Sequence, residues 1–400
     1  MLEHIGNEVK YKEYRENRGM TEYKRLGDYI REVNVRNREL KVTNLVGLTI
    51  DKAFIPSVAN VIGTDLSNYK VIRKEQFACS LMQVSRDGKM PVAMFKEDEA
   101  IMSPAYPMFE VIDKTMLMPQ YLMMWFSRSE FDREASYYAV GGVRGSLTWE
   151  DFCNMQLPIP SITRQREIVS EYETLTNRIR LNNQMIQHLE ATAQALYRKT
   201  FVDSIDKENL PEGWRMGKFT EIVKICGGGT PSTDEANYWQ NGEIPFYSPG
   251  DKTNSYYSLR TEKHITEDGL AHCSSKLYPQ NTSFVTARGA TTGGLAMAGC
   301  EMAMNQTCYA LKGKEASIPF YVHQLAIETM ASLKKEAVGA TFEALVTKDF
   351  DNTEIVIAPK EKVMAYNEEV AIVYHHILLT QQENVKLTEL QSLLLAKMGQ

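Results

Sequence analysis

Residues 139–152 read AVGGVRGSLTWEDF, and residues 337–350 read AVGATFEALVTKDF. Ala, Val, Gly, Leu, Asp and Phe coincide when these two stretches are aligned. Each stretch is followed by a strand end that runs through proline into a long helical pattern, at residues 159–168 and 357–366. Upstream, RLGDYIREV (25–33) matches RMGKFTEIV (215–223). Three matches in the same order indicate a duplicated unit, and such internal repetition fixes the architecture.

The first part of each copy is a turn-rich segment that predicts an α+β globular domain. Short β-branched runs, such as residues 42–50, 69–72 and 281–287, are typical of strands between loops. Helical patterns occur near the end of each copy, at residues 119–132 and 319–333. We therefore expect two pseudo-repeated globular domains, each large enough for its own core.

The second part of each copy predicts a long helix. Residues 164–200 contain neither Gly nor Pro, and residues 363–398 contain no Pro. Apolar residues recur in steps of four and three, which is the pattern of a coiled-coil seam. A helix of this length spans on the order of 55 Å and is unstable alone, so it needs a partner. The seam is predicted to comprise Ile168, Tyr172, Leu175, Ile179, Asn182, Ile186, Leu189, Leu196, Val370, Val373, Ile377, Leu387 and Leu394.

Asn182 is a polar residue near the middle of this seam. The second helix also becomes polar near its middle, around Thr380, Gln381 and Asn384. If the helices form an antiparallel coiled coil, these polar layers meet, and a buried polar residue fixes register at a cost in stability. The alternative is that Asn182 lies at a solvated edge.

Composition places the chain among soluble, ordered proteins. It has 400 residues, 43% hydrophobic and 24% charged, with 45 Lys and Arg against 51 Asp and Glu, giving a net charge of -6. No run of consecutive apolar residues is long enough for a transmembrane helix. The N-terminus is charged and lacks an apolar core, so no secretory signal is expected. The six cysteines form no C-x-x-C pair, so a zinc ribbon or a disulfide framework is not expected. The cysteine pattern predicts a cytoplasmic location instead.

No catalytic motif stands out. CGGGTPS (226–232) lacks the P-loop and dinucleotide-binding patterns, so we interpret it as a tight turn in which Gly supplies positive φ. There is no G-x-S-x-G, no H-E-x-x-H and no deaminase zinc pattern. The sequence predicts neither a catalytic residue nor a metal site, and it favours binding over chemistry.

Local clusters of Arg, Lys, Asn, Gln and Tyr suggest a DNA-facing surface, because these side chains contact base edges, sugars and phosphates. In the first domain the candidates are Arg36, Asn37, Arg38, Arg73, Gln76, Arg86, Lys89 and, for phosphate, Arg144. In the second domain they are Lys252, Asn254, Tyr256, Arg260, Lys263 and Arg288.

The second copy contains the motifs WRMGKF (214–219), GGGTPS (227–232), IPFYSPGD (244–251) and MNQTCYAL (304–311). The first copy contains AYPMFEV (105–111), residues 141–161 and IPSITRQREIV (159–169). With these motifs in this order, the chain resembles the specificity (S) subunits of type I restriction-modification systems. The first copy departs from the family in lacking a G-G-T-P-S stretch.

The resemblance implies a domain order: a charged extension (1–22), a first target-recognition domain (23–160), a first spacer helix (161–203), a second target-recognition domain (204–360) and a second spacer helix (361–400). It implies that each domain reads one half of a bipartite target on double-stranded DNA. Two methyltransferase (M) subunits, which bring S-adenosylmethionine, and a restriction/translocase (R) subunit are the implied partners. This chain is then expected to bind no cofactor itself and no membrane.

Two other functions fit the residues. One is a scaffold, in which the domains bind protein and the helices oligomerise. The other is a single-chain enzyme that holds a nucleotide or S-adenosylmethionine at the GGGT loop, although a base-gripping motif is missing.

Overall fold

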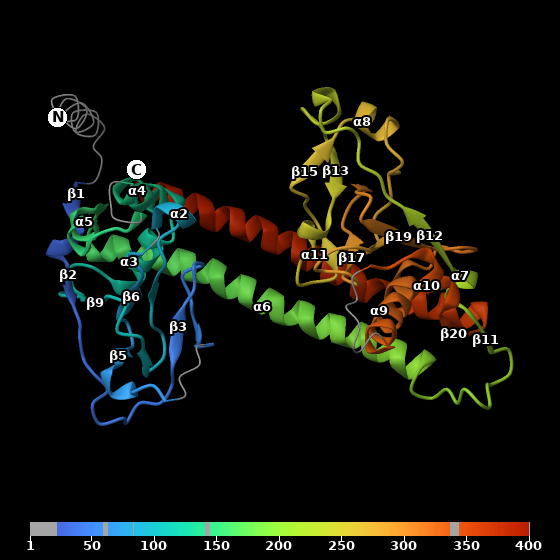
Figure 1. Ribbon diagram of the computed structural model, residues 1–400, viewed down its shortest axis with the longest axis horizontal. Coiled ribbons are helices and arrows are strands. Elements are labelled where there is room, and N and C mark those ends of the chain that lie inside the picture. The colour runs from blue at the N-terminus through green and yellow to red at the C-terminus, as the bar shows by residue number, and fades with distance from the viewer. Residues whose placement is uncertain (1–21, 59–62, 83, 141–144, 337–343, 400) are drawn as a thin grey trace. The chain divides into compact units, whose positions relative to one another are not determined.

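The computed structural model describes residues 22–58, 63–82, 84–140, 145–336 and 344–399. The chain divides into two compact units. The N-terminal unit comprises residues 1–178 and 387–400, and the C-terminal unit comprises residues 179–386. Two long helices, α6 (Ile162–Phe201) and α11 (Lys360–Lys397), contribute a segment to each unit. The predicted α+β class and both long helices are confirmed (Figure 1).

The N-terminal unit is built from short antiparallel strands. A four-stranded sheet has the order β2–β9–β6–β7, and β1–β10, β3–β4 and β5–β8 form separate pairs. The strands are β1 (Tyr23–Arg25), β2 (Ile30–Glu32), β3 (Val46–Leu48), β4 (Phe54–Pro56), β5 (Lys70–Arg73), β6 (Phe77–Cys79), β7 (Val92–Met94), β8 (Glu99–Met102), β9 (Met108–Val111) and β10 (Gln156–Pro158). The helices before α6 are α2 (Val84–Asp87), α3 (Pro119–Phe126), α4 (Ser129–Ala139) and α5 (Trp149–Asn154).

Aromatic side chains fill the core of this unit. The rings of Phe77 and Phe109, on neighbouring strands, stack with centroids 5.0 Å apart. Phe126 of α3 and Phe152 of α5 pack against Phe109, so the helices are fixed to the sheet through one aromatic cluster. Val169 of α6 belongs to the same core, which anchors the start of the long helix.

The C-terminal unit has a five-stranded sheet, ordered β12–β19–β16–β17–β14, and a three-stranded sheet, ordered β15–β13–β18. Its strands are β11 (Arg215–Lys218), β12 (Val223–Gly227), β13 (Ile244–Tyr247), β14 (Tyr257–Ser258), β15 (Lys263–Ile265), β16 (Ser283–Thr286), β17 (Leu295–Ala298), β18 (Ala303–Met304), β19 (Cys308–Gly313) and β20 (Glu354–Ile357). Its shorter helices are α7 (Phe219–Ile222), α8 (Glu267–Ala271), α9 (Pro319–Glu336) and α10 (Thr347–Asn352).

Each unit closes with the same arrangement immediately before its long helix. In the N-terminal unit, β1 pairs antiparallel with β10, and α5 precedes β10. In the C-terminal unit, β11 pairs antiparallel with β20, and α10 precedes β20. We call these pairs the strand clasps. Their common order is consistent with the duplication read from the sequence, although residues 141–144 and 337–343 of the repeated motif lie outside the described residues.

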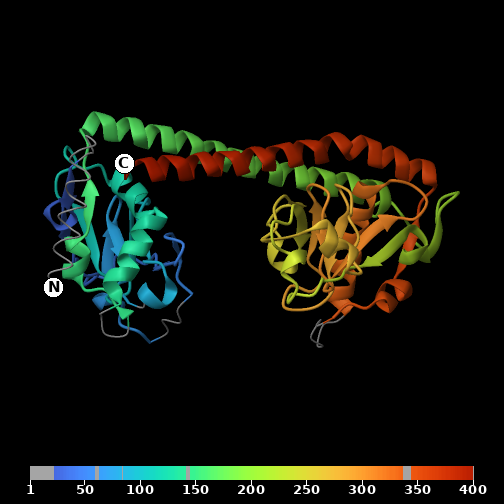
Figure 2. The same cartoon turned by 90° about the horizontal axis from the view of Figure 1, so that it is seen from above.

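The two long helices run antiparallel within each unit (Figure 1, Figure 2). In the N-terminal unit, Gln391 donates to Thr176 Oγ1 over 2.7 Å. In the C-terminal unit, the Tyr366 hydroxyl donates to the Ala193 carbonyl over 3.1 Å. Every residue named for the seam is buried or half-buried. No helix in the described part of the chain is long and apolar enough to span a membrane.

The polar layers of the two helices meet in the C-terminal unit. Asn182 is 1% exposed, so it does not lie at a solvated edge of the helix pair. Its amide contacts Glu383 and Asn384 of α11. A buried amide with partners on the facing helix specifies one axial alignment of the pair.

Candidate nucleic-acid interface

Predicted basic residues of the N-terminal unit lie on loops and strand ends. Arg36 is half-exposed and donates to the Asn68 carbonyl over 2.5 Å, whereas Arg38 is exposed. Arg73, at the end of β5, is exposed and lies 3.9 Å from a Glu99 carboxylate oxygen. These side chains reach solvent from positions that the sheet and its loops hold.

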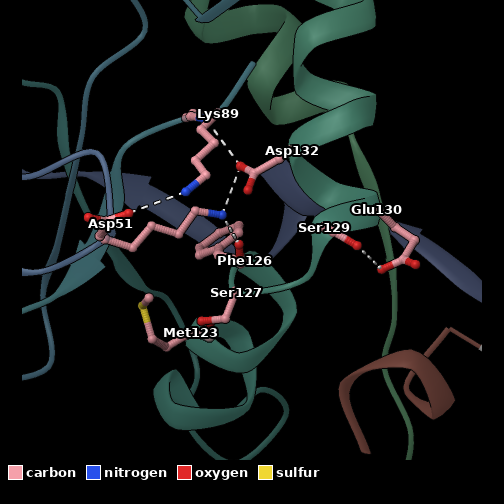
Figure 3. Close-up of polar contacts among 10 residues, drawn as sticks. Asp51, Lys89, Met123, Phe126, Ser127, Ser129, Glu130 and Asp132 are labelled. Atoms are coloured by element: carbon pink, nitrogen blue, oxygen red, sulfur yellow. Dashed lines mark hydrogen bonds and ion pairs between the residues drawn. The ribbon is translucent and has the colours of Figure 1, made fainter. Parts of the chain in front are cut away.

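Arg86 and Lys89 form exposed ion pairs. The Arg86 guanidinium lies 2.6 Å from the Asp87 carboxylate. The Lys89 ammonium lies 3.2 Å from the Asp51 carboxylate, a pair that Figure 3 shows. Exposed pairs of this kind contribute about 0–1 kcal/mol to stability. Both cations can therefore exchange their carboxylate partner for a phosphate at little cost.

Asn37 and Gln76 do not face solvent. Asn37 is 4% exposed, and its side-chain amide bonds both backbone groups of Val42, which closes the 37–42 loop. Gln76 is 9% exposed; it accepts from the Arg73 backbone and donates to Glu110. The structure gives both residues loop-shaping contacts, and so we remove them from the DNA-facing set. Arg144 lies outside the described residues.

Lys52 was not predicted, yet it connects three segments of this surface. Its ammonium lies 2.8 Å from Asp132 of α4 and also donates to the Phe126 carbonyl, at the C-terminal end of α3. Only 10% of its side chain is exposed, and burial lowers its pKa. Asp132 also accepts from the Met90 backbone, which adjoins Lys89. Figure 3 shows Asp132 and Phe126 beside the Lys89–Asp51 pair.

The contact of Lys52 with Asp132 and the end of α3 is favourable for two reasons. A cation at a helix C-terminus complements the helix dipole, as does an acid in the first turn of the next helix. A buried ion pair whose remaining groups are hydrogen-bonded avoids the cost of an isolated charge. The pair therefore fixes the β3–β4 turn against the α3–α4 junction and places Asp51 beside Lys89.

In the C-terminal unit the exposed candidates are Lys252, Asn254, Arg260, Lys263 and Arg288. The Lys252 side chain lies across Gly294, where an added Cβ would be 3.3 Å from its Cδ. The Lys263 ammonium lies over the Trp239 ring, 5.8 Å from its centroid. Arg288 forms an isolated β-bridge with Ala344, so its backbone is fixed while its side chain reaches solvent.

Tyr256 is the exception in this unit. Its ring packs against Tyr374 of α11 and His323 of α9, with centroids 5.7 Å and 4.8 Å away. Its hydroxyl donates to the Glu190 carbonyl and accepts from Gln324, and burial raises its pKa to about 12. Tyr256 is thus half-buried within the unit, which contradicts its prediction as a DNA contact.

The GGGTPS loop is a site of close packing. None of Gly227, Gly228 and Gly229 has positive φ, so the turn interpretation gave the wrong reason for these glycines. A Cβ on Gly228 would lie 2.0 Å from the Asn305 carbonyl oxygen, and one on Gly229 would lie 2.2 Å from Ser274 Oγ. Gly is required at positions 228 and 229 because neighbouring segments approach the backbone too closely for any side chain, whereas a Cβ on Gly227 would meet nothing within 4 Å.

Sequence reasoning also missed Glu190 and Gln381, whose side chains bond the backbone around Tyr256 and Tyr257. Gln381 was noticed only as part of the polar middle of its helix. Glu190 adjoins the seam but breaks no periodicity, so no pattern signalled it. Among the described residues, no group of three or more His, Cys, Asp or Glu side chains is arranged to hold a metal ion.

Comparison with known proteins agrees with the family resemblance seen in the sequence. Residues 211–391 match the family model described as the type I restriction modification DNA specificity domain. The MjaIX specificity subunit, a type I restriction enzyme component of Methanocaldococcus jannaschii, is 32% identical over 154 residues, which cover 38% of this chain and 35% of that protein. The HindI specificity subunit of Haemophilus influenzae is 22% identical over 373 residues, covering 75% of this chain and 81% of that protein.

A solved structure extends the likeness to the fold of the whole chain. The type I restriction-modification system S subunit from M. genitalium superposes with a TM-score of 0.58, at 11% identity. The superposition covers 95% of this chain and 96% of that one.

Proposed function

We propose that this chain is a non-catalytic specificity subunit of a type I restriction-modification system, in line with its similarity to that family over residues 211–391 and to the HindI subunit, and that each of its units reads one half of a bipartite DNA target. The observation that carries this proposal is the repeated strand clasp before each long helix. A duplicated fold with diverged loops suits two related tasks, namely recognition of two different half-sites. Exposed cations in both units supply phosphate and base contacts.

The long helices are proposed to set the unread gap between the half-sites and to dock two methyltransferase subunits. In the N-terminal unit, α6 and α11 form a groove lined by Ser170, Leu175, Leu390, Leu393, Leu394 and Lys397. Leu390 and Leu393 are 48% and 59% exposed, which is a feature of protein-binding surfaces. The methyltransferase subunits would bring S-adenosylmethionine, and a restriction/translocase subunit would join the complex.

A methylome tests this function directly. The chain is expressed with its cognate methyltransferase in a bacterium free of DNA methylation, and N6-methyladenine is mapped by long-read sequencing. We expect a split motif with an adenine in each half and a fixed gap. A matched strain with the methyltransferase alone controls for modification that does not depend on this chain.

The outcomes separate the alternatives. No new methylation, with a methyltransferase that is active beside another specificity chain, supports the scaffold. In a third strain that expresses this chain without the methyltransferase, new methylation would support the single-chain enzyme. The packing of Gly228 against Asn305 counts against the enzyme, because a phosphate cradle needs backbone N–H groups open to a ligand.

A further inference from the structure

Residues 255–257 of the C-terminal unit are bonded by side chains from both long helices. From α6, Glu190 Oε1 accepts from Ser255 Oγ over 2.5 Å and from the Tyr256 backbone N–H over 2.8 Å. From α11, Gln381 Oε1 accepts from the Tyr257 N–H over 3.3 Å, and its Nε2 donates to the Tyr257 carbonyl over 3.1 Å. Consecutive backbone groups are thus held by two different helices.

These contacts complete the edge of a sheet. Strand β14 is an edge strand of two residues and pairs on one side only, where Met297 and Gly299 donate to the Tyr256 and Ser258 carbonyls. The Tyr257 backbone groups point to the opposite side, and the Gln381 amide bonds both of them. An amide side chain offers the donor and acceptor that a further strand would supply, so the edge is closed by α11.

The same contacts determine where the preceding residues lie. Thr253 Oγ1 donates to the Tyr257 carbonyl over 2.9 Å, which folds segment 252–254 back onto β14. Lys252 and Asn254, both exposed, are the DNA-contact candidates on this segment. The segment itself contains no strand or helix of its own; it lies between the 3-10 turn Pro249–Asp251 and residues 255–257, and so the latter hold its C-terminal end.

Gln381 is buried and Glu190 is half-buried where they make these contacts. Gln381 is 9% exposed, and burial raises the pKa of the Glu190 carboxyl despite its hydrogen bonds to Ser255 and Tyr256. Partial burial of a carboxylate costs free energy, and hydrogen bonds to the carboxylate offset that cost. Its role here is to accept two hydrogen bonds from the loop.

We propose that Glu190 and Gln381 are positioning residues that fix the DNA-contacting segment 252–254 to the two long helices. This inference rests on the proposed function, in which that segment contributes to reading one half-site. Without either side chain, the segment samples positions away from its native place. If it occupies that place a tenth of the time, the apparent affinity for the half-site falls about ten-fold.

The test uses the full chain assembled with its methyltransferase. Binding is measured on the bipartite target and on two altered targets, each with one half-site scrambled. For Glu190→Ala and Gln381→Met, scrambling one half is expected to change affinity little, whereas scrambling the other half still weakens binding as in the wild type. Glu190→Gln is expected to restore both discriminations, because its carbonyl oxygen can accept the same two hydrogen bonds. Gln187→Ala, an exposed change on the same helix, serves as the control.

Hydrogen exchange gives a second measurement that does not depend on DNA. In Glu190→Ala the peptide containing the Tyr256 and Tyr257 amides should exchange at least ten-fold faster, with peptides from β16 unchanged. Unchanged exchange, or equal loss of discrimination at both half-sites, would overturn the inference. Wild-type protein without any sequence-dependent binding would instead overturn the proposed function, and the exchange measurement would still test the positioning contacts.

Discussion

Asn182 of α6 donates its side-chain amide to Asn384 Oδ1 of α11 over 2.9 Å, and the same nitrogen lies 3.0 Å from Glu383 Oε2. One buried amide therefore joins the middle of the first long helix to two residues of the second. This contact specifies how the two helices align within the C-terminal unit, as a polar layer does in a coiled coil.

Replacing Asn182 with Ala should lower the free energy of unfolding by about 1–3 kcal/mol, because the half-buried acceptors Glu383 and Asn384 on α11 lose the donor of a buried amide. Urea unfolding followed by circular dichroism measures this change. Gln187→Ala, which alters an exposed residue of the same helix, should change stability by less than about 0.5 kcal/mol. Equal effects of the two substitutions would show that the polar layer contributes nothing specific.

Lys52→Met should destabilise the protein by about 3 kcal/mol, because it leaves Asp132 buried without its cation. Lys89→Met is the matched control, since it removes a lysine of the same surface whose ion pair with Asp51 is exposed and contributes about 0–1 kcal/mol. Chemical unfolding of both variants gives the comparison. If Lys89→Met costs as much as Lys52→Met, burial is not what distinguishes the two pairs.

We expect the buried side chain of His323 to make the folded protein less stable in acid. It is 1% exposed, its Nδ1 lies 3.0 Å from Ser283 Oγ, and burial lowers its pKa to about 3. The unfolded chain therefore binds a proton at higher pH than the folded chain does. Its contribution to stability is present above pH 6.5 and is lost as the pH falls toward 3, by at most about 1.4 kcal/mol per pH unit. Unfolding free energies of His323→Asn should depend less steeply on pH, whereas those of His264→Asn, an exposed change, should follow the wild type.

Asn254 and Arg288 should differ in how they affect DNA binding. Asn254→Ala is expected to cost about 1–3 kcal/mol on the cognate target and to relax the requirement at one base pair. Arg288→Ala is expected to weaken binding to all sequences alike and to reduce the salt dependence by about one phosphate contact. Titrations on cognate and scrambled DNA at several salt concentrations separate these effects. A uniform loss for Asn254→Ala would reassign it to the phosphate backbone.

Lengthening both long helices should lengthen the gap between half-sites. One helical turn adds about 5.4 Å, which is between one and two base pairs at about 3.4 Å each. We expect a chain with four residues inserted into each helix to methylate the same two half-sites with a longer spacer. Methylome sequencing reads the spacer directly, and a change within either half-site would contradict the role of the helices as a spacer.

Periodic features of the sequence predicted the helices well. The seam positions are all buried or half-buried, and the meeting of Asn182 with the polar middle of α11 followed from antiparallel pairing. A repeating apolar pattern has one simple structural solution, and so the sequence is sufficient to predict it. The residues around each seam position need not be known.

The candidate site was less predictable, because exposure of an isolated polar residue depends on segments far away in the chain. Asn37 is enclosed by the loop it closes, and Tyr256 is covered by α9 and α11. Nothing in the sequence around Lys52 distinguishes it from other lysines, yet Asp132, eighty positions later, pairs with it where only 10% of its side chain is exposed. Composition indicates which residue types can contact DNA, but it does not say which of them the fold uses internally.

The strand clasps have a consequence for how such a protein can change. Because Tyr23 is paired with Pro158 and Arg215 with Ile357, the chain enters and leaves the globular part of each unit at one place. A segment whose two ends adjoin can be exchanged as a block without altering the path of the chain outside it. If each unit reads one half-site as proposed, recombination between related genes at these strands would transplant the whole globular part of a unit and give a new specificity in one event, while the helices that follow keep their own sequence.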